Sequence, residues 1–146
     1  MRMVNYNYVI PTRDQEHVDT CYAVLKSLTE EELSKLWNGV GSNELVFRFF
    51  KPPQWVRDIF SEASKFHDVA YWIGGSKHHR IAVDREFAIQ CFKAIYDLPW
   101  LQRFAALLWV KIDDDILRNF GSLTFVRRLE PCYDIEQLLK EVESGT

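Results

Sequence analysis

The chain has 146 residues and a mass of 17.3 kDa, a size that indicates one domain over residues 1–146 rather than two. Apolar residues make up 47 % of the chain and aromatic residues 14 %, so it can bury a core and is not disordered. The formal net charge of −3 provides no general attraction to nucleic acid or to an anionic membrane, and we expect no nucleic-acid partner.

Two further features predict a cytoplasmic protein without a transmembrane span. The longest uninterrupted apolar run extends from Phe104 to Val110, whereas a membrane-spanning helix needs about 20 residues, and the N-terminus lacks the apolar segment of a signal peptide. The three cysteines, Cys21, Cys91 and Cys132, are widely spaced, which indicates reduced thiols rather than disulfides or a zinc site. The sequence does not define the oligomeric state.

The first third of the chain predicts two strands and two helices. Residues 4–10 show a period of two, which is typical of a short strand. An apolar stripe predicts a helix over 14–28, and the capping box at Thr29–Glu32 begins a short helix that stops at Asn38-Gly39. Residues 45–50 predict a second strand, which Pro52-Pro53 ends.

The middle of the chain predicts a helical hairpin. Residues 54–71 have helical spacing, Gly74-Gly75 ends this helix, and Ser76 caps the next one. The stripe of the second helix includes Ile81 and Asp84, which are expected on its buried face. The predicted fold is therefore mainly α, with an antiparallel helical hairpin at its core and minor β-structure.

Three more helices are predicted towards the C-terminus. Pro99 suits the first turn of one, and its Trp and Phe stripe between Trp100 and Trp109 is expected in the core. The acidic residues Asp113–Asp115 are expected to begin a short helix that ends at Gly121. Residues 134–143 predict a last amphipathic helix.

The hairpin brings together residues that can carry chemistry. His67 and Asp84 lie at similar distances from the glycine turn, so they can meet across the two helices. A buried carboxylate and a buried imidazole each need a partner, and one ring nitrogen that donates to Asp84 leaves the other free to accept a proton from water. Tyr71 follows His67 by one turn and can also reach Asp84. Asp68 can face a cation if main-chain carbonyls come from the turn at Gly39 to Gly41.

The pattern of these motifs resembles the phospholipase A2 superfamily, and more closely its small bacterial and phage members, over residues 38–121. The matching stretches are Asn38-Gly-Val-Gly41, His67-Asp68-Val-Ala-Tyr71 and Asp84-Arg-Glu-Phe87. The sequence departs from the secreted members, which have cysteines beside the His-Asp pair, and Val40 stands where the nearer relatives have cysteine.

The resemblance implies a site and a reaction. His67 is the general base that activates water, Asp84 orients it, and Tyr71 braces Asp84. Asp68 is a calcium ligand, together with carbonyls of the loop at Gly39 and Gly41, and the ion stabilises the oxyanion. The implied reaction is hydrolysis of a phospholipid or other ester without a covalent intermediate, so the expected partner is a lipid-ester substrate.

Two other functions stay open at this point. In the first, the chain is a non-catalytic accessory or structural protein, and His67 and Asp84 are a buried polar pair. In the second, it is a metal-dependent phosphohydrolase of the His-Asp type, which requires that His17 and Asp113–Asp115 converge on His67 and Asp68. A metal bound at His67 itself distinguishes this second alternative, because a general base must leave its imidazole uncoordinated.

Overall fold

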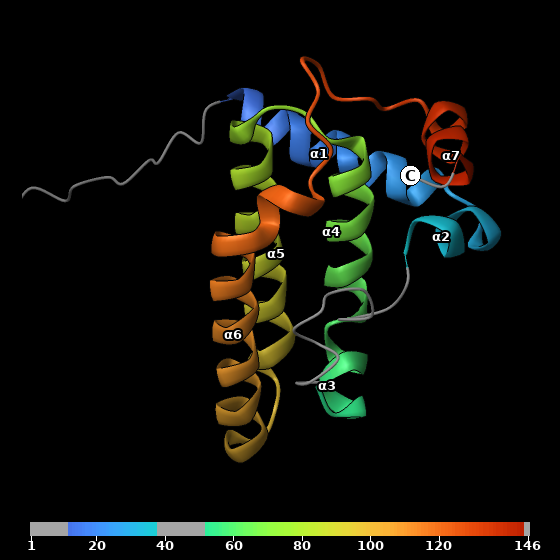
Figure 1. Cartoon of the computed structure of the whole chain (residues 1–146). Helices are drawn as coiled ribbons and strands as arrows, with labels where there is room; N and C mark the ends of the chain where they lie inside the picture. Colours follow the sequence, from blue (N-terminus) through green and yellow to red (C-terminus); the bar gives the residue numbers. More distant parts are fainter. Residues whose placement is uncertain (1–11, 38–51, 145–146) are drawn as a thin grey trace, which may run out of the picture.

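The computed structural model describes residues 12–37 and 52–144, and these form seven helices (Figure 1). The helices are α1 (Thr12–Ser27), α2 (Glu30–Leu36), α3 (Gln54–Ile59), α4 (Ser61–Ile73), α5 (Lys77–Tyr96), α6 (Trp100–Thr124) and α7 (Ile135–Glu143). The prediction of a mainly α fold is confirmed. The predicted minor β-structure is absent from the described residues apart from one isolated bridge between Gly75 and Arg127, and the strands expected over 4–10 and 45–50 lie outside those residues.

The predicted hairpin is formed by α4 and α5, which run antiparallel, and α6 returns along α5 (Figure 1). Helix α1 crosses both arms of the hairpin, and α2 and α7 pack against each other beside the end of α4 (Figure 1). A salt bridge of 3.1 Å between Lys35 and Glu143 joins α2 to α7. Within the described part of the chain, no helix is both long enough and apolar enough to cross a membrane.

The turn between α4 and α5 depends on two glycines. Gly74 has a φ of 69° and Gly75 a φ of 134°, values that side-chain-bearing residues rarely adopt. A Cβ atom at Gly74 would also lie 2.1 Å from the carbonyl oxygen of Val126. Ser76 begins α5 as predicted, and the backbone N–H of Ser76 donates to Nδ1 of His79 at 3.0 Å, in a capping box that has histidine in the usual place of Glu or Gln. These contacts set the angle at which α5 returns along α4.

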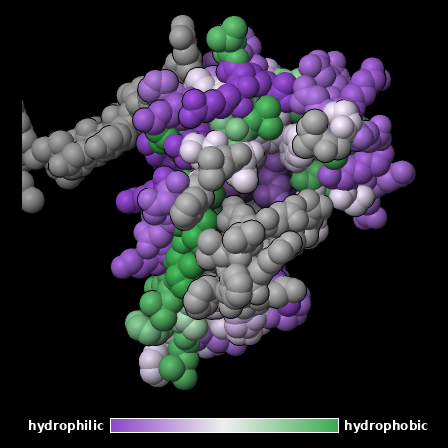
Figure 2. Space-filling model, in the orientation of Figure 1, coloured by the Kyte–Doolittle hydropathy of each residue, from purple (hydrophilic) through white to green (hydrophobic). Residues whose placement is uncertain are grey.

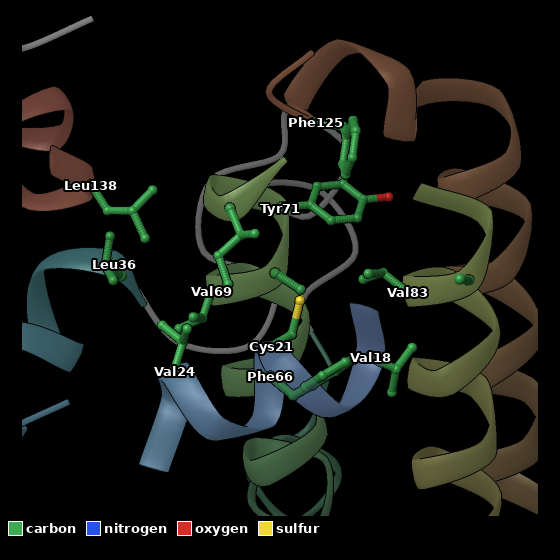
Figure 3. Close-up of a cluster of buried hydrophobic side chains, with 13 residues drawn as sticks. Val18, Cys21, Val24, Leu36, Phe66, Val69, Tyr71, Val83, Phe125 and Leu138 are labelled. Carbon is green, nitrogen blue, oxygen red and sulfur yellow. The ribbon is translucent and has the colours of Figure 1, made fainter. Parts of the chain in front are cut away.

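Two hydrophobic clusters hold the helices together. The first lies between α1, α4 and α5 and is closed by α2, α7 and Phe125 (Figure 3). It includes the stacking of Tyr22 on Phe66, with ring centroids 4.2 Å apart. The second cluster joins α3, α4, α5 and α6 through Val56, Phe60, Ala63, Cys91, Ile95, Ala106 and Val110. The hairpin is therefore packed on both sides, and this fixes the positions of the side chains between its arms.

Two predicted helix boundaries are wrong. The helix predicted over 54–71 is divided at Phe60, whose φ of −97° and ψ of 3° turn its ring into the second cluster. The helix predicted to begin at Asp113–Asp115 does not begin there, because α6 continues through these residues to Thr124. Neither Gly nor Pro interrupts residues 100–120, and Asp114 pairs with Arg118 one turn later at 3.1 Å.

Two predictions of burial are also wrong. Ile81 is 41 % exposed, because α5 turns Ala82 and Val83 towards the core instead. The stripe between Trp100 and Trp109, expected in the core, lies largely on the surface. Helix α6 instead packs on α5 through the opposite side, which carries the buried Ala106 and Val110.

Candidate active site

The two arms of the hairpin bring His67 and Asp84 into contact, as the sequence predicts. His67 and Tyr71 are one turn apart on α4, and both face Asp84 on α5. Nε2 of His67 lies 3.0 Å from Oδ1 of Asp84, and the hydroxyl of Tyr71 donates to the same oxygen at 2.6 Å. Burial, followed by the charge of Asp84, raises the pKa of Tyr71, so its hydroxyl stays a neutral donor. One carboxylate oxygen therefore accepts from both side chains that the sequence assigned to it.

The second oxygen of Asp84 faces a residue that the sequence analysis missed. Nη1 of Arg80, one turn before Asp84 on α5, lies 3.6 Å from Oδ2 of Asp84 and also donates to the carbonyl of Leu117 at 3.4 Å. The i, i+4 spacing of Arg80 and Asp84 is visible in the sequence, and it was the available signal for this pair. Arg80 therefore places a positive charge beside the carboxylate and connects it to α6.

Asp68 lies beside the other nitrogen of the imidazole. Its Oδ1 is 3.8 Å from Nδ1 of His67, and its side chain is 36 % exposed, whereas His67 as a whole is 8 % exposed. The ring is thus almost enclosed, and the nitrogen expected to be a free acceptor faces a carboxylate near the surface.

The two carboxylates determine the protonation of His67. Burial by itself would lower the pKa of His67, but hydrogen bonding to Asp68 and Asp84, together with their negative charges, outweighs burial and raises the pKa to about 9. The ring is consequently protonated at neutral pH. The neutral ring that the sequence analysis expected requires that the charge of Asp68 be neutralised or that the pH be raised.

Helix α6 packs against the site at Gly121, a residue that was expected only to end a helix. A Cβ atom at Gly121 would lie 2.8 Å from the hydroxyl of Tyr71 and 3.2 Å from Nη1 of Arg80. The ring of Phe87 packs on His67 with centroids 4.8 Å apart. Close approach of α6 thus keeps Tyr71 and Arg80 directed at Asp84.

Asp68 is the one expected calcium ligand that lies among the described residues. Asp68 has the hard oxygen ligands that calcium prefers. However, no group of three or more His, Cys, Asp or Glu residues that could hold a metal occurs in the described part of the chain. Gly39 and Gly41, the other expected calcium ligands, lie outside the described residues.

The position of His17 does not support the hypothesis of a His-Asp phosphohydrolase. His17, which would have to join His67, instead has Nδ1 at 2.8 Å from the hydroxyl of Tyr133, and its ring lies against that of His79. Burial, followed by the charge of His79, lowers the pKa of His17 to about 4. His17 therefore belongs to a separate buried cluster between α1, α5 and the C-terminal segment.

A cavity of about 360 Å³ lies between α1, α2, α4 and α5. Its lining includes Ala63, one turn before His67 on α4, but neither His67 nor Asp84. It is lined by Tyr22, Leu25, Lys26, Leu33, Glu62, Ala63, Lys65 and Gln90. This cavity is near the candidate site, but it does not give access to the imidazole.

Comparison of the chain with protein-family models, curated proteins and solved structures finds no match. The chemistry must therefore be argued from the site itself. Its defining feature is an imidazole held between two carboxylates, of which Asp84 is half-buried and paired with Tyr71 and Arg80, and Asp68 lies nearer the surface.

Proposed function

We propose that the chain hydrolyses an acyl ester of a lipid, with water activated by His67 and Asp84. The observation that carries the proposal is the 3.0 Å contact between Nε2 of His67 and Asp84, whose same oxygen is held by Tyr71. This arrangement fixes the ring orientation and leaves Nδ1 as the nitrogen that can exchange a proton with water.

The reaction uses the ring in its neutral form. Nδ1 of His67 takes a proton from a water molecule as that water attacks the ester carbonyl, while Nε2–H continues to donate to Asp84. The negative charge of Asp84 stabilises the imidazolium that forms, and Tyr71 and Arg80 hold the carboxylate in place. When the tetrahedral intermediate collapses, Nδ1–H returns the proton to the departing alkoxide, and the products are a fatty acid and an alcohol.

Neutralisation of Asp68 is the condition for this chemistry near pH 7. With Asp68 ionised, the raised pKa keeps His67 protonated and unable to act as a base. A calcium ion at Asp68 would offset the negative charge that raises the pKa of His67, and it would polarise the ester carbonyl. The described residues supply only this one acidic ligand, so we assign no step to the ion.

The lipid character of the substrate follows from the motif rather than from the site alone. The pattern His67-Asp68-x-x-Tyr71 and Asp84-x-x-Phe87 resembles the phospholipase A2 superfamily. The ring of His67 contacts Tyr71 and Phe87 at centroid distances of 4.0 and 4.8 Å, so residues of the two motifs lie together in one site.

The test measures fatty-acid release from vesicles of phosphatidylcholine and phosphatidylglycerol, with and without added calcium. We expect release by the unaltered chain and a loss of at least about 100-fold for His67→Gln, because general-base catalysis contributes roughly 10²–10⁴-fold. His78→Gln is the matched control, since His78 is exposed at the start of α5 and should leave the rate unchanged.

A non-catalytic role is the second candidate, and the enclosure of His67 favours it. The ring is 8 % exposed and both of its nitrogens face carboxylates, as in a structural charge network. If a correctly folded chain releases no fatty acid at any pH from 6 to 10, with or without calcium, the hydrolase proposal is wrong and this role remains.

A further inference from the structure

Helix α6 has two apolar faces, and the second is on the surface. The face opposite Ala106 and Val110 is formed by apolar residues that recur at each turn of the helix, which we call the α6 stripe. Figure 2 shows it as a continuous hydrophobic band along one edge of the molecule. Its members and their exposed fractions are Trp100 75 %, Leu101 64 %, Phe104 65 %, Leu107 38 %, Leu108 52 % and Ile112 40 %.

Such a band is unusual for a monomer. Soluble monomers rarely expose contiguous apolar patches beyond a few hundred Å², and large patches mark interaction sites. The stripe includes two large aromatic side chains, Trp100 and Phe104, of the kind that dominates interface energetics. Within the part of the chain that the structure describes, no helix packs on them, because α6 contacts α5 through the other side, at Ala106 and Val110.

We propose that the α6 stripe binds the same stripe of a second copy of this chain, with the two α6 helices antiparallel. This inference is independent of the proposed hydrolysis. The two-fold axis crosses the helices at the height of residue 106, the midpoint of the stripe, so both copies bury the same residues. Phe104 of each copy then lies level with Leu108 of the other.

The available surface is sufficient for a stable dimer. A standard interface removes roughly 800 Å² from each partner. In addition to the six residues of the stripe, Phe92 and Tyr96 at the end of α5 are 53 % and 76 % exposed and precede the same α5–α6 turn. Eight large side chains, each exposed by more than a third, can provide an area of this order.

Charge on the exposed side of α6 favours the antiparallel arrangement. Two charged residues lie on the same side, Lys111 beside the end of the stripe and Asp115 beyond it, and both are exposed. Parallel helices would place each of these two residues beside the same residue of the other chain, so that like charges would meet. Antiparallel helices instead bring Lys111 level with Trp100 and Leu101 of the other copy, where its aliphatic stem can pack and its ammonium group can lie over the indole.

The charge of α6 gives no preference for an anionic lipid surface as the occupant. The three basic residues of α6 are balanced by its three acidic residues, Asp113–Asp115, and the chain as a whole carries a formal charge of −3. Helices that lie on membranes usually have a polar face rich in Lys and Arg.

Sedimentation velocity of the full chain between 1 and 100 μM tests the association. We expect a dimer that dissociates on dilution, and a roughly 100-fold weaker association for the double variant Phe104→Asp/Leu108→Asp, because two central apolar contacts are lost. The matched control is Leu129→Asp, since Leu129 is 98 % exposed outside the stripe. A monomer at all concentrations, or a dimer equally sensitive to Leu129→Asp, overturns the proposal. So does monomeric protein that binds vesicles through the stripe.

The orientation is tested with a spin label at Arg118→Cys in a Cys132→Ser background. Residue 118 lies twelve positions beyond the proposed axis, so the labels of an antiparallel dimer are about 36 Å apart along the helices at 1.5 Å per residue. Parallel helices would bring them within roughly 10 Å of each other in the interhelical direction. A short distance therefore overturns the antiparallel arrangement.

Discussion

At the scale of single residues, the candidate site is a chain of alternating charges. Arg80, Asp84, His67 and Asp68 follow one another at 3.6, 3.0 and 3.8 Å. Each inner member has an oppositely charged neighbour on both sides when the imidazole is protonated. This arrangement holds a buried imidazolium without leaving an unpaired charge, which would otherwise be costly.

The first prediction concerns stability at high pH. The pKa of His67 is raised to about 9 in the folded chain, above its ordinary value of 6.5, so the folded state binds the proton more tightly. The resulting stabilisation is fully present below pH 6.5 and is lost as the pH rises through about 9. Urea unfolding from pH 6 to 10 should show a decline of about 3 kcal/mol at most that His67→Gln removes and His78→Gln retains. If the free energy of unfolding of the unaltered chain and of His67→Gln changes in the same way with pH, His67 is not the cause of the decline.

At the scale of elements, the C-terminal end of α4 is completed by a segment that is distant in sequence. The backbone N–H of Val126 donates to the carbonyl of Tyr71 at 3.2 Å, and Nε of Arg128 donates to the carbonyl of Ile73 at 3.1 Å. Arg128 also forms a two-pronged pair with Glu141 of α7. Carbonyls that the helix itself leaves without partners are thus satisfied by the chain that follows α6.

The second prediction tests this contact with two adjacent arginines. Arg128→Ala removes the donors to the α4 carbonyls and to Glu141, and we expect it to lower the free energy of unfolding by about 2–3 kcal/mol. Arg127→Ala should change it by less than about 0.5 kcal/mol, because that side chain is exposed. Chemical denaturation at pH 7 measures both. Equal losses for the two variants would show that the guanidinium of Arg128 does not secure the end of α4.

At the scale of the whole molecule, His17 connects three regions of the chain. It lies on α1, its Nδ1 bonds Tyr133 of the C-terminal segment at 2.8 Å, and its ring meets His79 of α5 at a centroid distance of 4.4 Å. His17 is 2 % exposed. The junction therefore depends on a neutral imidazole.

The third prediction is a loss of stability in acid at this junction. The pKa of His17 is lowered to about 4, so the unfolded chain binds the proton more readily than the folded chain. Stability should fall as the pH decreases from 6.5 towards 4, with a total loss of about 3 kcal/mol at most. Thermal unfolding at pH 4.5 and 7 should differ less for His17→Gln than for the unaltered chain or for His78→Gln. An unchanged pH difference in His17→Gln would rule out His17 as the cause.

Local signals were sufficient for most of the helices. The capping box at Thr29 and Glu32 is present as predicted, because capping depends on hydrogen bonds within one turn. The helix predicted over 134–143 is also present, with Asp134 as its N-cap. The glycine turn after α4 is equally local. The same signals placed His67 and Asp84 at matching heights on the two arms, and this predicted their contact.

The sequence by itself determined that the described chain would be helical, where α4 turns into α5, and that His67, Tyr71 and Asp84 would meet, because spacing along a helix and distance from a turn are short-range properties. Only the tertiary structure decided the surroundings of these residues: the approach of α6 at Gly121, the pairing of Arg80, and the exposure of Trp100 and its neighbours. Periodicity shows that a helix has an apolar face, but not whether another element of the same molecule covers it, since burial depends on contacts between segments far apart in the chain.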